Sequence, residues 1–385
     1  MLTAVYGGSF NPPHIGHISA ARAAAEQLGP GKLLIMPSNI PPHKALDTDS
    51  PDAMERLLLA ELAFAELGLA DISDIEMRRE GPSYTADTVA ALLEENQEIC
   101  LLMGTDMLLT FGSWYRSGWL LENVSLAVFA RRGGDYDTLV QAAEQLRSQY
   151  GARITLIEQE PIDISSTELR RALKERAGRE FLPDKVYERI IQKRSYGAKP
   201  ELVWLRDIAC GMLSPGRVAH VLGTEKEAVK LAARWGIDAG EAAEAAILHD
   251  ITKNLSYEEQ LLLCEKYGII TDVADMPKLL HPVTGAALAR DLFGVDDAVY
   301  GAIRWHTTGR VNMTGLEKII YLADYIEPER EDFDGLAELR SLAYEDMDAA
   351  LMLGLELTLE DLSRQGLPVH PSLTEVLKAL KRERN

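Results

Sequence analysis

The feature of this sequence that most constrains its fold is a change of pattern between its two halves. Up to about residue 160, short apolar runs of strand length alternate with segments that carry apolar residues at helical spacing. The runs that predict strands are residues 2–6, 32–37, 99–104, 124–130 and 154–158. Strands that alternate with helices are typical of a parallel sheet covered on both faces. We therefore expect an α/β fold in the first half.

The second half has a different pattern. After about residue 197 no convincing strand follows, and long segments rich in Ala, Leu and Glu succeed one another with short polar breaks. The join is expected within residues 194–202, where Gly197 and Pro200 separate two helical patterns. A chain of 385 residues is also too long for one comfortable core. We predict an α/β domain over residues 1–196 and an all-α domain over residues 197–385.

Composition excludes several classes of protein. Apolar content of 46% and charged content of 26% are typical of globular proteins. Neither a membrane span nor a basic start followed by an apolar run is present, so a cytoplasmic protein with no membrane partner is expected. The net charge of −20 argues against nucleic-acid binding. The scattered Cys100, Cys210 and Cys264 indicate buried thiols, not disulfides or a zinc finger.

The stretch GGSFNPPHIGHI, residues 7–18, follows the first predicted strand and opens a helix expected over residues 15–28. His14 and His17 are three apart, so their side chains share a helix face about 5–6 Å apart at Cβ. Gly7 and Gly8 allow close backbone approach, and free N–H groups at a helix start favour anions. The stretch predicts a phosphate site, because nucleotides bind at the carboxyl ends of parallel strands. Taken alone, the histidines are better explained as ordinary surface residues.

A second motif, DISSTELRR at residues 163–171, follows the last predicted strand. Ser165, Ser166 and Thr167 can cap a helix, and Arg170 lies one turn further on with a guanidinium that fits phosphate oxygens. By itself this pattern is better explained as a plain helix cap with a solvated arginine. Together with the histidine pair, it predicts a second group of phosphate ligands.

With these motifs, the first half resembles the nucleotidyltransferases that move an adenylyl group from ATP. Four further segments make residues 1–196 similar to nicotinate-nucleotide adenylyltransferases: PSNIPPHK (37–44), GPSYTADTV (81–89), MGTDMLLTFGSWY (103–115) and FARRG (129–133). The resemblance implies a Rossmann-like domain that joins nicotinate mononucleotide to the adenylyl group of ATP, releases pyrophosphate and uses Mg²⁺ with ATP. A phosphopantetheine transferase lacks the SYTADT context, and a class I aminoacyl-tRNA synthetase needs a lysine-rich loop that is not visible here.

The resemblance also implies roles for single residues. His14, His17 and Arg170 are the expected catalytic residues of this half. The expected ATP site comprises Gly7, Gly8, Ser9, Phe10, His17, Asp106, Ser165, Ser166 and Arg170. Lys44 is placed to steer a phosphate, and Asp106 to accept a hydrogen bond from a ribose hydroxyl. Thr85, Trp114 and Tyr115 match positions that hold the pyridine ring, although core packing explains Trp114 equally well.

The second half carries a histidine and aspartate pattern made of His220, His249, Asp250, His281, His306 and Asp324. Imidazole and carboxylate are ligands of divalent metals. The segment AAILHDITK is interpreted as an apolar helix with the His249–Asp250 pair inside it, where an unpaired aspartate would be costly to bury. A metal would remove that cost. Each residue alone has an ordinary structural explanation, and His370 stays unexplained.

This spacing resembles the HD phosphohydrolases. RVAHVLG (217–223), IRWHTTGR (303–310) and KIIYLADYIEPER (318–330) are similar to bacterial HD-domain enzymes that cleave diadenosine tetraphosphate symmetrically. The resemblance implies two metals, for which iron or manganese is expected rather than zinc. Asp250 would be the catalytic residue that bridges the two metals, and the other five residues would complete the ligand set. Thr307, Thr308, Gly309 and Arg330 would hold substrate phosphates. A regulatory nucleotide-binding module and a phosphohydrolase of another nucleotide remain open, and a homo-oligomer is compatible with the sequence.

Overall fold

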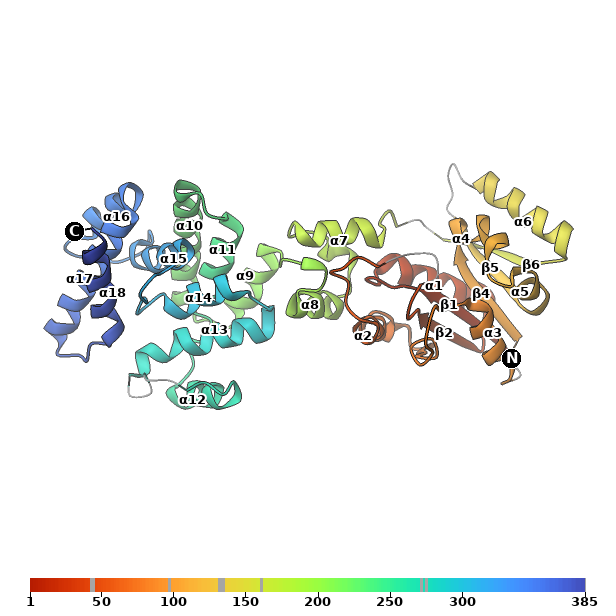
Figure 1. The fold of residues 1–385 in the computed structure, drawn as a ribbon, viewed down its shortest axis with the longest axis horizontal. Coiled ribbons are helices and arrows are strands. Elements are labelled where there is room, and N and C mark those ends of the chain that lie inside the picture. The colour runs from red at the N-terminus through yellow and green to blue at the C-terminus, as the bar shows by residue number, and fades with distance from the viewer. Residues whose placement is uncertain are drawn as a thin grey trace. The chain divides into compact units, whose positions relative to one another are not determined.

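The computed structural model describes residues 1–41, 46–95, 98–130, 136–159, 162–270, 273 and 276–384. The chain divides into two compact units, Met1–Lys199 and Pro200–Asn385, each of which is described by itself (Figure 1). The division falls within residues 194–202, the segment with Gly197 and Pro200 in which the sequence places the domain boundary. No described helix is long and apolar enough to cross a membrane.

The first unit is built on one parallel sheet. Its six strands lie in the order β3-β2-β1-β4-β5-β6, and every neighbouring pair is parallel. The strands are β1 (Leu2–Gly8), β2 (Lys32–Pro37), β3 (Ala70–Ile72), β4 (Glu98–Gly104), β5 (Ser125–Ala130) and β6 (Arg153–Glu158). This strand order is that of the Rossmann fold, so the predicted α/β class is confirmed.

Helices surround the sheet, as Figure 1 shows. They are α1 (Ile15–Leu28), α2 (Ala53–Phe64), α3 (Thr85–Leu93), α4 (Thr105–Leu109), α5 (Ser117–Asn123), α6 (Tyr136–Tyr150), α7 (Ser166–Lys174) and α8 (Asp184–Lys193), with short 3₁₀ turns η1 (Ala65–Leu67), η2 (Phe111–Ser113), η3 (Arg179–Phe181) and η4 (Ser195–Gly197). Residues of α3, α5 and α6 form one core cluster with β1, β2, β4, β5 and β6. Helix α1 begins and ends where the sequence predicts.

The central strands are buried on both faces. Leu33, Leu34, Ile35 and Met36 of β2 are all at most 6% exposed, as in parallel strands covered by helices on each side. Strand β3 was not predicted. It has three residues, none of them buried, at the edge of the sheet beside β2, so it lacks the apolar run that marked the other strands.

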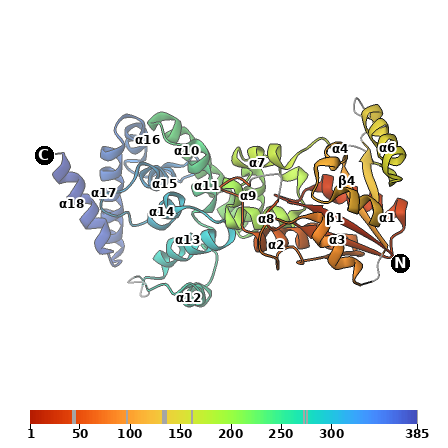
Figure 2. The same cartoon turned by 45° about the vertical axis from the view of Figure 1, so that its right-hand side comes forward.

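The second unit is helical throughout its described residues, as predicted. Its helices are α9 (Leu202–Gly211), α10 (Pro215–Trp235), α11 (Ala239–Leu248), α12 (Tyr257–Lys266), α13 (Leu280–Phe293), α14 (Asp297–Trp305), α15 (Gly315–Ile326), α16 (Leu336–Glu345), α17 (Met347–Gln365) and α18 (Pro371–Glu383), with one 3₁₀ turn η5 (Pro277–Leu279). Helices α10, α11, α14 and α15 pack together at the centre (Figure 2). Four fully buried alanines of α11 allow this close approach: Ala242, Ala243, Ala245 and Ala246.

The cysteines are free thiols. Cys100 and Cys264 are buried as expected, whereas Cys210 is only half-buried near the end of α9, so the prediction of a buried thiol is wrong there. Cys210 is the second-last residue of α9, which ends at Gly211, so fewer neighbouring residues cover it than cover a side chain in the middle of a helix.

Candidate active sites

The turn between β1 and α1 brings His14 and His17 together. His14 is the N-cap of α1 with an extended backbone, and His17 stands at the third helical position. Their ring centroids lie 3.8 Å apart. The ring of Phe10, which is 1% exposed, packs edge-on against His17 with centroids 5.2 Å apart. The predicted pair is therefore a single group at the carboxyl end of the first strand.

The hydrogen bonding of His17 defines its tautomer. The backbone N–H of His14 donates to Nδ1 of His17 at 3.2 Å. Burial, together with the neighbouring His14, holds the pKa of His17 well below its usual value. A neutral imidazole with an accepting Nδ1 carries its proton on Nε2. His17 can thus donate one hydrogen bond from Nε2.

A cavity of about 300 Å³ adjoins this pair. The predicted residues that line it are His14, His17, Asp106, Ser165 and Ser166. Ser165 caps α7 by accepting from the N–H of Glu168, whose carboxylate in turn accepts from the N–H of Ser165. The start of α7 therefore faces the same cavity as the histidines and presents the partial positive charge of a helix N-terminus.

A second cavity of about 530 Å³ lies in the same unit. The predicted residues that line it are Gly7, Gly8, Ser9, Thr85, Trp114 and Tyr115. Trp114 also packs on the core cluster, so both of its expected roles are compatible with its position. Tyr115 is 51% exposed, and its ring lies 4.9 Å from that of Tyr84. The aromatic side chains make this cavity suitable for a planar ring.

Two predicted ligands of the first unit, Arg170 and Phe10, do not line either cavity. Arg170 is buried; its Nη2 lies 2.6 Å from Asp47 Oδ2, and its Nη1 donates to the carbonyl of Asn11 at 2.9 Å. Phe10 supports the His17 ring from within the core. Lys44, with the end of the PSNIPPHK segment and most of FARRG, lies outside the described residues.

Sequence reasoning missed Arg56, which connects two loops beside the larger cavity. It is 1% exposed and donates to the carbonyls of Ser9 at 3.0 Å, Ser38 at 2.7 Å and Asn39 at 2.8 Å. Ser9 and Ser38 line the larger cavity. The available signal was a basic residue on the apolar face of a helix, ERLLLAELAF, which is costly unless its donors are satisfied.

The second unit assembles the six predicted metal ligands, but with one correction. Helix α11 ends at Leu248, so His249 is its C-cap and Asp250 lies in the following turn, not inside a helix as predicted. His306 is likewise the C-cap of α14. The reason is local, because the last carbonyls of a helix lack intrahelical partners. His249 and His306 use Nδ1 to bind such carbonyls, those of Ala246 and Ile303, each at 2.7 Å.

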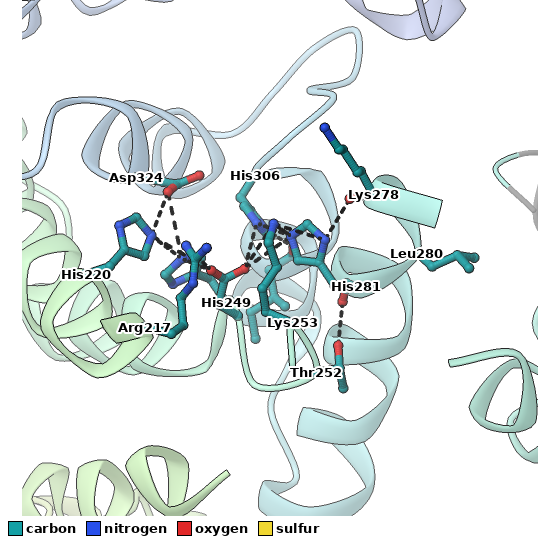
Figure 3. Close-up of polar contacts among 12 residues, drawn as sticks. Arg217, His220, His249, Thr252, Lys253, Lys278, Leu280, His281, His306 and Asp324 are labelled. Carbon is teal, nitrogen blue, oxygen red and sulfur yellow. Dashed lines mark hydrogen bonds and ion pairs between the residues drawn. The ribbon is translucent and has the colours of Figure 1, made fainter. Parts of the chain in front are cut away.

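All four histidines of this cluster are oriented in the same sense. Nδ1 of His281 lies 2.9 Å from the carbonyl of Lys278, and Nδ1 of His220 lies 3.3 Å from Glu327 Oε1. The Nε2 atoms face inward. Those of His220 and His249 are 3.3 Å apart, and those of His281 and His306 are 3.2 Å apart (Figure 3). Each histidine donates its Nδ1–H to an acceptor on the outer side of the cluster. The four Nε2 atoms therefore keep lone pairs that can bind a cation.

The Asp250 carboxylate lies between these two histidine pairs and is 2% exposed. Its Oδ2 is 3.4 Å from His249 Nε2 and 3.8 Å from His220 Nε2. Its Oδ1 is 3.1 Å from His281 Nε2 and 3.7 Å from His306 Nε2. Asp324 adds an oxygen 2.9 Å from His220 Nε2. The two oxygens of Asp250 thus each face a different pair of histidines.

This arrangement fits divalent cations. Burial lowers the pKa of His306 to about 3 and also lowers the pKa of His281, so both are neutral imidazoles. Lone pairs that face a buried carboxylate repel it unless positive charge lies between them. Two cationic side chains flank Asp250: Arg217 Nη1 is 3.1 Å from Oδ2, and Lys253 Nζ is 3.9 Å from Oδ1.

The predicted phosphate-binding residues of this unit have different surroundings. Thr307, Thr308 and Gly309 directly follow His306, and Thr308 is buried and donates to the carbonyl of Gly309 at 3.2 Å. Arg330 is exposed beyond α15, with its guanidinium 5.8 Å from the Tyr325 ring centroid. The unexplained His370 is the N-cap of α18, where its Nδ1 accepts from the N–H of Ser372.

Comparison with known proteins matches each unit separately. Residues 5–172 match the Cytidylyltransferase-like family model, and residues 217–329 match the HD domain model. The chain is 33% identical over 195 residues to a probable nicotinate-nucleotide adenylyltransferase of Carboxydothermus hydrogenoformans, covering 50% of this chain and 96% of that protein. It is 40% identical over 161 residues to a symmetrical bis(5'-nucleosyl)-tetraphosphatase of Bacillus subtilis, covering 41% of this chain and 86% of that protein.

The first half of the chain belongs to the nicotinate-nucleotide adenylyltransferase family, and the second half belongs to the family of symmetrical bis(5'-nucleosyl)-tetraphosphatases. A solved structure from Clostridium acetobutylicum, described as a predicted HD superfamily hydrolase involved in NAD metabolism, is 37% identical with a TM-score of 0.45 and covers 47% of this chain and 97% of its own. The adenylyltransferase half contains the two cavities, and the HD half contains the His and Asp cluster. The HD-domain match and this cluster together indicate a divalent metal site.

Proposed function

We propose that this chain is a bifunctional enzyme. The first unit would transfer an adenylyl group from MgATP to nicotinate mononucleotide, giving nicotinate adenine dinucleotide and pyrophosphate. The second would hydrolyse diadenosine tetraphosphate to two ADP at a centre of two metals. The observation that carries the second assignment is the Asp250 carboxylate, whose two oxygens each face a separate pair of histidines. Family membership in each half supports both activities.

In the first unit, positioning and electrostatics account for the reaction. The phosphate of the mononucleotide attacks the α-phosphorus of ATP, and charge grows on the phosphate oxygens. His17 donates from Nε2 to these oxygens, and His14 and the start of α7 face the same cavity. The larger cavity beside it takes the pyridine nucleotide between Thr85, Trp114 and Tyr115. No side chain needs to act as a nucleophile.

In the second unit, His220, His249 and Asp324 would hold one cation and His281 with His306 the other, while Asp250 would contact both. When bound, such cations supply a water that is nucleophilic at neutral pH and neutralise charge on the phosphate. Four imidazoles and two carboxylates suit iron or manganese. Arg217 and Lys253 lie beside Asp250, where positive charge attracts a polyphosphate.

Product analysis tests the hydrolase assignment. Purified protein is incubated with diadenosine tetraphosphate and Fe²⁺ or Mn²⁺, and the nucleotides are separated by chromatography. ADP as the sole product is expected. AMP with ATP would show cleavage of another bond, and the absence of any product would favour a regulatory module or a different nucleotide substrate. Pyrophosphate release that requires both ATP and nicotinate mononucleotide tests the first unit in the same preparation.

A further inference from the structure

The four histidines of the metal cluster do not share one kind of outer partner. His249, His281 and His306 direct Nδ1 to the backbone carbonyl three residues before them. His220 instead directs Nδ1 to a side chain, the Glu327 carboxylate, at 3.3 Å. Within a helix the carbonyls of α10 are already used, so this ring needs an acceptor from elsewhere. Glu327, the residue after α15, supplies it.

Glu327 is held firmly in this position. It is 2% exposed, and its Oε2 accepts from the N–H of Glu329 at 2.6 Å. Its backbone is held by Arg340, which donates from Nη2 to the carbonyl of Glu327 at 2.8 Å and from Nε to that of Ile326 at 3.0 Å. The two carboxylate oxygens are therefore divided between His220 and the backbone.

Helix α10 leaves room for this carboxylate. A Cβ on Gly223 would lie 2.5 Å from Glu327 Oε2 and 3.4 Å from its Cδ. Gly223 is buried in the middle of α10, one turn after His220. Glycine weakens a helix interior relative to alanine, so its presence here is explained by the close approach of Glu327.

We infer that Glu327 is a positioning residue of the metal centre. Its carboxylate accepts Nδ1–H of His220 and so keeps the Nε2 lone pair directed at Asp324 and Asp250, while Gly223 makes the approach possible. A charged acceptor holds the ring more strongly than a carbonyl does. The inference rests on the proposed metal-dependent function, and it concerns the cation held by His220, His249 and Asp324.

Isothermal titration calorimetry of the full chain with Mn²⁺ tests this inference. The wild type is expected to bind two ions. In Glu327→Ala, affinity for one of them should fall about 10–100-fold, the usual effect of removing an outer partner of a metal-bound histidine, while the other ion is unaffected. Glu327→Gln keeps an oxygen acceptor, so its affinity for that ion should fall less than in Glu327→Ala. Gly223→Ala should resemble Glu327→Ala, because it displaces the same carboxylate.

Glu225→Gln is the matched control. Glu225 is a buried carboxylate on the same helix that binds Arg206 at 2.7 Å and does not contact the cluster, so both ions should bind normally. In protein loaded with diamagnetic Zn²⁺ and labelled with ¹⁵N-histidine, His220 should bind the metal through Nε2 and be protonated at Nδ1 in the wild type, and should lose this preference in Glu327→Ala. A purely structural role would not change that tautomer.

Two further results would overturn the inference. Unchanged Mn²⁺ affinity at both sites in Glu327→Ala, with an unchanged His220 tautomer, would contradict the role of Glu327 while leaving the metal centre intact. A wild type that binds no Mn²⁺ would instead contradict the proposed centre itself. If Glu327→Ala does not fold, the comparison of Glu327→Gln with Glu225→Gln decides the question by the same two measurements.

Discussion

At the scale of single residues, both sites use histidine at helix ends with opposite hydrogen-bond polarity. At the start of α1, His17 accepts a backbone N–H at Nδ1, so Nε2 carries a proton and can bind an anion. At the ends of α11 and α14, His249 and His306 direct Nδ1 to carbonyls, so Nε2 has a lone pair and can bind a cation. The exposed backbone group at each helix end selects the tautomer.

The first prediction concerns the protonation of His17. Because burial and His14 lower its folded-state pKa, this residue should stay neutral as the pH falls through about 6.5, the ordinary histidine value. The unfolded chain takes up a proton there, so His17 contributes a loss of stability as the pH falls below that value. NMR titration of ¹⁵N-histidine-labelled protein checks this. A His17 signal that titrates near pH 6.5 would contradict the burial argument.

The second prediction concerns the ion pair between Arg170 and Asp47. If Arg170 holds the triphosphate, the Asp47 carboxylate competes with ATP for its guanidinium. Asp47 is 58% exposed, so the pair is worth only about 0–1 kcal/mol. Asp47→Asn should therefore lower the KM for ATP by at most about five-fold, with little change in kcat. A raised KM for ATP would indicate that the ion pair instead keeps the site in shape. The control is Asp71→Asn, because Asp71 is an exposed carboxylate on β3 that pairs with Lys32.

At the scale of elements, each site depends on where helices and strands end. The first lies at the carboxyl ends of β1 and β4, where parallel strands leave a crevice for nucleotides. The second lies among α10, α11, α13, α14 and α15, with ligands near the ends of four of them. Its geometry depends on close packing of the alanine-rich α11 against its neighbours.

The third prediction tests that packing. Ala243 of α11 is fully buried, so Ala243→Leu should overpack the centre of the second unit and cost about 1–3 kcal/mol of unfolding free energy. Scanning calorimetry should show a lower transition for that unit alone. Ala239→Leu, at the exposed first position of the same helix, should have little effect. An unchanged transition in Ala243→Leu would mean that α11 is not closely packed.

At the scale of the whole molecule, the two units carry separate sets of candidate residues. Every residue that lines the two cavities belongs to Met1–Lys199, and the six predicted metal ligands belong to Pro200–Asn385. The chain has a net charge of −20, yet both proposed reactions act on polyphosphates. Each site must therefore offset that charge locally, through helix N-termini and imidazole donors in one unit and through bound cations in the other.

The fourth prediction follows from this separation. His17→Ala should lower kcat/KM for adenylyl transfer by about 10²–10³-fold, the usual cost of one donor to developing charge, and leave hydrolysis unchanged. Asp250→Ala should abolish hydrolysis and spare adenylyl transfer, because it removes the carboxylate shared by both ligand groups. Both activities are measured on each variant, with circular dichroism as a check of folding. Loss of both activities in one folded variant would contradict independent sites.

The sequence alone determined the fold class, most of the strands and the residues of the histidine and aspartate cluster. Strand and helix periodicities are local properties, and the spacing of the histidines and aspartates is read directly along the chain, so these predictions needed no long-range contact. The alternation of apolar runs likewise placed the GGSFNPPHIGHI turn after a strand and before α1.

The tertiary structure decided what depends on distant partners. Strand β3 exists only because β2 pairs with it. The two histidine pairs that face Asp250, together with Asp324, bring residues from five segments of the chain into one cluster. The loops that Arg56 connects and the approach of Glu327 to His220 were equally hidden, because packing alone brings those residues together.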